Sequence, residues 1–88
     1  MKFYKYDLPI AGVGEIILPV GAKITQALIQ DGKFVFWALV DENEKRREMR
    51  KFELYMTGKS VEGDVKTIYN TIYDVSSGLV FHFVELKK

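Results

Sequence analysis

The chain has 88 residues, enough for one domain over 1–88 and too few for two. Its formal net charge of +1 argues against a nucleic-acid partner held by many phosphate contacts. The absence of cysteine excludes disulfides, thiolate metal sites and a cysteine nucleophile. The N-terminal residues have no apolar signal segment, and no apolar run reaches the ~20 residues of a membrane-spanning helix. We therefore expect a cytoplasmic protein without a membrane partner.

The first half of the chain alternates strand-forming residues with glycine and proline. A first strand is predicted over 2–8, before Pro9, and a second over 14–18, before Pro19. A third and a fourth strand, over 22–30 and 33–41, flank Asp31-Gly32, which is the strongest hairpin signal in the chain.

The segment 42–51 does not follow this pattern. Asp41 and Glu44 could form a capping box, but Met49 is the only apolar residue between Asp41 and Phe52. A helix here would have almost no apolar face to bury. We therefore predict a solvated loop, with room for a helical turn.

The second half returns to the strand pattern. Strands are predicted over 51–57, 66–74 and 79–86, and Ser76-Ser77-Gly78 marks a hairpin between the last two. The chain as a whole predicts an all-β domain of about seven short, mostly antiparallel strands, in a small sandwich or a partly open barrel.

The fourth strand is apolar on both faces. Phe34, Phe36, Ala38 and Val40 point one way, while Val35, Trp37 and Leu39 point the other. Such a strand needs cover on both sides, from a second subunit or from a curled sheet within one chain. Since an 88-residue chain has little material for two covers, we predict a homo-oligomer.

Two polar features resemble catalytic motifs without completing them. Thr57-Gly58-Lys59-Ser60 resembles the end of a P-loop, but Glu53 occupies the position of the required first glycine. We interpret it as a turn whose lysine and peptide N–H groups could face a phosphate. His82 is the only histidine, and we interpret it as a hydrogen-bonding residue on a sheet face.

The remaining candidates are cations and tyrosines. Lys45, Arg46, Arg47, Arg50 and Lys51 form the only basic cluster, although Glu42, Glu44 and Glu48 lie within it. Tyrosines 4, 6, 55, 69 and 73 could form an aromatic rim. The predicted ligand-binding residues are Arg46, Arg47, Arg50, Tyr55, Lys59 and His82, and we predict no catalytic residue, metal ligand or cofactor.

Several short motifs recur together in a known group of sequences. They are Lys5-Tyr6, Leu18-Pro19 with Gly21-Ala22, Trp37-Ala38-Leu39-Val40-Asp41, Phe52, Tyr55, Thr57-Gly58 and Val80-Phe81-His82. Over nearly its whole length the chain resembles an uncharacterised family of short phage and prophage proteins. Met56 and Lys59 depart from the Gly-Thr-Gly-His that usually follows the tyrosine, so the chemistry of this loop differs. The resemblance implies a phage-encoded accessory protein in the host cytoplasm, without a defined activity.

These observations favour a protein that acts by binding. It would sequester a small anionic ligand such as a nucleotide, or it would occlude a host protein in counter-defence. One alternative is a small structural or assembly protein of the virion. A third is a weak nucleotide hydrolase that uses His82.

Overall fold

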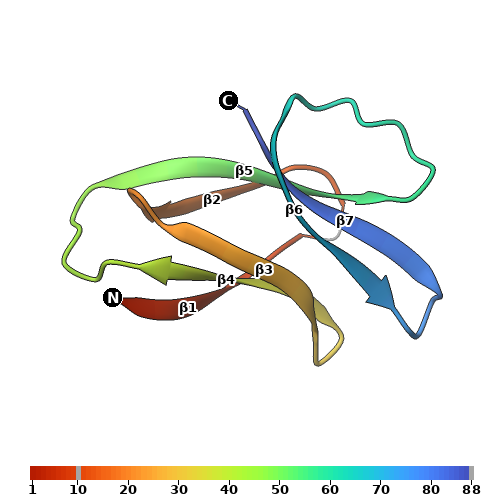
Figure 1. Ribbon diagram of the computed structural model, residues 1–88, viewed down its shortest axis with the longest axis horizontal. Helices are drawn as coiled ribbons and strands as arrows, with labels where there is room; N and C mark the ends of the chain where they lie inside the picture. Colours follow the sequence, from red (N-terminus) through yellow and green to blue (C-terminus); the bar gives the residue numbers. More distant parts are fainter. Residues whose placement is uncertain (10, 88) are drawn as a thin grey trace.

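Two antiparallel sheets face each other in the computed structural model, which describes residues 1–9 and 11–87 (Figure 1). The three-stranded sheet has the order β1-β4-β3, and the four-stranded sheet has the order β2-β5-β7-β6. The predicted all-β class and small sandwich are confirmed, and the sheets do not close into a barrel. The strands are β1 (Lys2–Asp7), β2 (Gly14–Pro19), β3 (Lys23–Gln30), β4 (Lys33–Val40), β5 (Arg47–Met56), β6 (Val65–Asp74) and β7 (Leu79–Leu86).

The core lies between the sheets and is rich in phenylalanine. Phe36 of β4 contacts Phe52 of β5 and Phe83 of β7, with ring centroids 5.0 and 5.6 Å apart. All three side chains are fully buried. Aromatic side chains of this size each remove roughly 150–250 Å² from water, so this cluster supplies a large part of the attraction between the sheets.

The two predicted hairpins are present at β3–β4 and β6–β7. At the first, Asp31 and Gly32 both have positive φ, at 52° and 77°. A two-residue type I′ turn requires this conformation at both central positions. At the second, Gly78 has a φ of 73° and its N–H donates to the carbonyl of Asp74 over 2.8 Å. Local turn chemistry therefore sets both hairpins.

The prediction of a loop over 42–51 is wrong for its second half, because β5 begins at Arg47. This part of β5 pairs with β2, in a register that places Leu18 opposite Glu48 and Ile16 opposite Arg50. Glu48 and Arg50 lie on the face of β5 that also carries Phe52. The charged residues on the inward face removed the apolar alternation by which a strand is recognised.

One side chain joins the edges of the two sheets. Asn70 lies in β6, beside a break in the register with β7. Its amide accepts from the N–H of Ala27 in β3 over 2.9 Å and donates to the carbonyl of the same residue over 2.7 Å. Ala27 is 1% exposed. The amide of Asn70 thus takes the place of a neighbouring strand for the one residue it reaches.

The outer face of β4 is only partly covered by the chain itself. Lys5 lies opposite Trp37 on β1, Gln30 lies opposite Lys33 on β3, and the two side chains hydrogen bond over 2.9 Å. This contact crosses β4 at Val35, which is 2% exposed. Trp37 stays half-buried beyond it. The homo-oligomer therefore stays a prediction, with a smaller apolar face than the sequence suggested.

Replacing Asn70 tests the edge bridge. We expect Asn70→Ala to lower the free energy of unfolding by about 2 kcal/mol, because the buried N–H and C=O of Ala27 both lose their partner. Urea unfolding followed by circular dichroism measures the change. Asn43→Ala is the control, since Asn43 is exposed and its side chain makes none of the described hydrogen bonds. An equal effect of the two substitutions would contradict the bridge.

Self-association tests the outer face of β4. If a second copy covers this face, sedimentation equilibrium will show assembly, and Trp37→Ser will shift the protein toward monomer. Ile17→Ser removes a 67% exposed apolar side chain from the other sheet and should leave the assembly unchanged. A monomeric wild-type protein at all concentrations would rule out the homo-oligomer.

Candidate functional site

Three of the predicted ligand-binding residues lie at one end of the molecule. Because β5 and β6 run parallel on either side of β7, the connection over 57–64 must cross over β7 from the start of that strand to its end, and it forms a wide loop (Figure 1). Tyr55 precedes this loop, Lys59 lies in it, and His82 lies opposite Tyr55 on β7. The strand order therefore gathers residues that are up to 27 positions apart in sequence, from position 55 to position 82.

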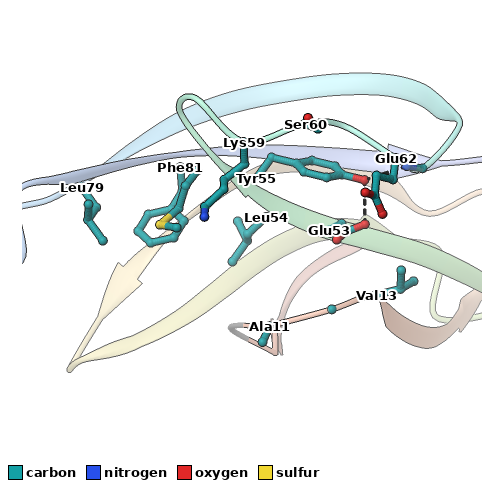
Figure 2. Close-up of a pocket in the computed structure, with 13 residues that line it drawn as sticks. Ala11, Val13, Glu53, Leu54, Tyr55, Lys59, Ser60, Glu62, Leu79 and Phe81 are labelled. Atoms are coloured by element: carbon teal, nitrogen blue, oxygen red, sulfur yellow. Dashed lines mark hydrogen bonds between the residues drawn. The ribbon is translucent and has the colours of Figure 1, made fainter.

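A groove of about 770 Å³ opens beside this loop. Leu54, Leu79 and Phe81 supply apolar lining, while Ala11 and Val13 lie on the opposite side (Figure 2). Its charged side chains are Lys59, Glu53 and Glu62. Figure 2 shows the amine of Lys59 near Leu54 and Phe81, whereas the two carboxylates lie together beyond Tyr55. The groove thus combines an apolar floor with opposite charges toward its two ends.

Tyr55 fixes the loop that forms the wall of this groove. Its hydroxyl donates to Glu53 Oε1 over 2.8 Å and accepts from the N–H of Gly63 over 3.1 Å. A Cβ at Gly63 would lie 2.8 Å from the Tyr55 oxygen and 2.9 Å from Leu86, so the close approach requires glycine. Burial and the hydrogen bond to Glu53 raise the pKa of Tyr55. Tyr55 therefore acts as a neutral anchor for the loop.

His82 lies on the outer face of β7, half-buried, between two threonines. Its Nε2 lies 2.8 Å from Thr57 Oγ1, and its Nδ1 lies 3.5 Å from Thr71 Oγ1. Tyr55, Lys59 and His82 also line a second hollow, of about 320 Å³, on this outer face. Its remaining lining is mostly apolar, including Val65 and Ile68. The short contact to Thr57 links His82 to the start of the loop.

Arg46 and Arg47 lie at the opposite end of β5 from Lys59. The guanidinium of Arg46 pairs with Glu44, over 2.7 Å between Nη2 and Oε1, and its hydrogen bonds lower the pKa of that carboxyl to about 2. Arg47 lines a small hollow with Tyr4, Tyr6 and other residues near β1. Within one chain the structure does not bring these arginines to Lys59, and their ligand-binding role stays a prediction.

Arg50 is held inside the sandwich by a carboxylate that sequence reasoning missed. Its Nε and Nη2 donate to the two oxygens of Glu85, each over 2.7 Å. Tyr69 donates to the same carboxylate, and Arg50 also donates to the carbonyl of Ala22. Glu85 is 3% exposed. Its place in the alternation Phe81, Phe83, Glu85 was the available signal, because a carboxylate on a core face requires a charged partner.

The pKa shifts follow from this arrangement. Burial alone would raise the pKa of Glu85, but the hydrogen bonds from Arg50 and Tyr69 outweigh it, and the pKa is lowered. Burial, followed by the hydrogen bond to Glu85, raises the pKa of Tyr69 to about 12. The hydrogen bond to Glu85 raises the pKa of Arg50. The pair is therefore ionised at neutral pH, and its fork geometry satisfies both carboxylate oxygens.

Two features are absent from the part of the chain that the structure describes. No group of three or more histidine, cysteine, aspartate or glutamate side chains within 1–9 and 11–87 could hold a metal ion. Over the same residues, none of the structure is a helix long and apolar enough to cross a membrane.

The buried pair makes stability depend on acid pH. A carboxyl whose pKa is lowered by folding contributes stability above its unfolded pKa of about 4.3, and that stability is lost as pH falls through the folded pKa. We expect Glu85→Gln to lower the free energy of unfolding by about 3 kcal/mol at pH 7, because Arg50 loses its charged partner. Below about pH 4 the difference in unfolding free energy between the variant and wild type should become smaller. Urea unfolding of both proteins, at about every pH unit between roughly pH 2 and pH 7, measures this difference. Glu15→Gln removes an exposed carboxylate, and its unfolding free energy should change with pH in the same way as that of wild type.

Comparison with known proteins adds a family without adding a function. No curated protein and no solved structure matches the chain. One family model matches residues 1–88, and its description is "domain of unknown function" (DUF7352). A match over the full length of the sequence is consistent with the resemblance to an uncharacterised family. The chain therefore belongs to the family of the domain of unknown function DUF7352.

Proposed function

We propose that this chain is a non-catalytic binding protein, which engages a segment of a partner protein through the groove beside Lys59. The observation that carries the proposal is the uncovered apolar lining of that groove. Leu79 and Val13, which both line it, are 44% and 46% exposed. Apolar side chains that converge on a concave surface, with charges at its margins, are typical of protein interaction sites.

The charges of the groove favour a protein over a small anion. One lysine and two glutamates line it, so a phosphate or nucleotide would meet more carboxylates than cations. Two of the three predicted arginines are engaged elsewhere, because Arg46 pairs with Glu44 and Arg50 pairs with Glu85, and Arg47 lies at the far end of β5. Of the two modes of binding expected from the sequence, occlusion of a partner protein fits these contacts better.

The resemblance to phage and prophage proteins gives the proposal its setting. In that setting the partner is a host protein, and the chain is an accessory protein that acts by covering a surface of it. A virion protein that uses the same groove for assembly is the alternative, and the two differ in the identity of the partner.

Site-specific crosslinking tests the proposal in the cell that carries the gene. A photoreactive benzoylphenylalanine at Leu79 should capture one protein, because this side chain is both exposed and part of the groove. The same group at Ile17, on β2 and 67% exposed, should not capture it. Mass spectrometry then identifies the captured protein as a cellular or a virion protein. Capture of the same proteins from both positions, or from neither, would refute binding at the groove.

A further inference from the structure

The alternation of hydrogen bonds along β5 shows which of its main-chain groups face the groove. The N–H of Thr57 donates to the carbonyl of Val80 in β7, over 3.0 Å. Since an antiparallel ladder alternates with a period of two residues, Tyr55 and Glu53 also bond toward β7. The N–H and C=O groups of the residues between them, Leu54 and Met56, then point away from β7. This is the side on which β2 pairs with the first half of β5.

The ladder between β5 and β2 independently shows that the even-numbered residues of β5 bond away from β7. The N–H of Val20 donates to the carbonyl of Arg46, over 3.0 Å, and the register continues from this pair to Gly14 opposite Phe52. β2 begins at Gly14, so the ladder stops there. The next position that would bond across is Leu54. The second half of β5 therefore has an open edge, with the groove where the neighbouring strand would lie.

The open edge carries three main-chain N–H or C=O groups without a described partner. They are the N–H and C=O of Leu54 and the N–H of Met56, because the carbonyl of Met56 already accepts from the N–H of Lys59 over 3.1 Å. Among residues 1–9 and 11–87 no other main-chain group bonds to these three. At Ala27 the protein satisfies an equivalent edge peptide with the amide of Asn70. Leu54 has no such side-chain partner in the same residues.

The flanking side chains define the chemistry of an occupant. Leu54, Leu79 and Phe81 offer apolar contacts, Lys59 lies toward the Met56 end, and Glu53 and Glu62 lie toward the other. A strand that lies along β5 places alternate side chains on the same face, about 6–7 Å apart. Two or three apolar residues in alternation would therefore meet the apolar lining, and charged residues outside them would meet the opposite charges.

We propose that a partner segment adds to the sandwich as a strand along Leu54–Met56, in line with β2. The segment is extended and apolar at alternate positions, with an acidic residue near Lys59 and a basic residue near Glu53 and Glu62. This proposal rests on the proposed function, and it names the kind of segment that the groove binds. Main-chain hydrogen bonds supply the attachment and the flanking charges supply the selection, as in other cases of strand addition.

A peptide-display experiment tests the strand addition with purified protein. A library of random linear 12-residue peptides, selected on the wild-type protein, should enrich sequences with alternating apolar residues between one acidic and one basic residue. In the best peptide, N-methylation should weaken binding by about tenfold or more at the residue whose N–H donates to the carbonyl of Leu54, and it should have little effect at the two adjacent residues, whose N–H groups point away from β5. No enriched peptide, or equal losses at adjacent residues of the best peptide, overturns the proposal.

Charge reversal tests the orientation of the segment. Lys59→Glu should lower the affinity for the selected peptide by about tenfold. Replacement of the acidic residue of the peptide by lysine should restore that affinity. Lys33→Glu changes an exposed lysine on β4, outside the groove, and should leave the affinity unchanged. Equal losses in both variants overturn the assignment of Lys59. If crosslinking at Leu79 succeeds and the methylation profile is flat, the binding function stands and strand addition fails.

Discussion

The contact of Phe36 with Phe52 and Phe83 is the interaction on which the rest of this sandwich depends. The two sheets share no backbone ladder, so their attachment comes from side chains alone. Phe36 belongs to the central strand of one sheet, and its two partners belong to the two central strands of the other. Burial of these rings holds the sheets at a fixed spacing, and every feature at the ends and edges is built on that spacing.

Two polar contacts specify how the sheets are aligned. The amide of Asn70 ties β6 to β3 at Ala27, and the Arg50–Glu85 pair reaches the carbonyl of Ala22 just before β3. Buried ion pairs contribute little net stability compared with apolar side chains of the same size, but they strongly disfavour arrangements that leave one partner alone. Both contacts end on the same segment of the three-stranded sheet. A shift of that sheet along the other would therefore break both together.

Much of the fold could be predicted from local chemistry. The hairpins at Asp31-Gly32 and at Gly78 follow from turn conformations that few residues adopt, and the core face of β4 follows from its alternation. The start of β5 at Arg47 could not be predicted, because its inward residues are charged. The sequence showed a basic cluster there, and only the pairing partners distinguish Arg50, bonded inside the sandwich, from Arg46 on the surface.

The site was predicted in pieces. Lys59, Tyr55 and His82 were identified one at a time as polar residues in a turn or on strands, and the structure places them around one loop. Their proximity depends on β7 lying between β5 and β6, which no local pattern encodes. The groove was not predicted at all. It exists because β2 is shorter than β5, and the relative lengths of paired strands depend on their register.

The central place of β7 has a consequence for how the chain reaches its fold during synthesis. β7 is the last of the seven strands to leave the ribosome, yet it pairs with both β5 and β6. Until residue 86 is available, β5 lacks one neighbour and β6 lacks its only one, and Phe36 has neither Phe83 nor a closed core to pack against. Assembly of the four-stranded sheet is thus held back until its final strand arrives, which favours a late and concerted folding step over gradual growth from the N-terminus.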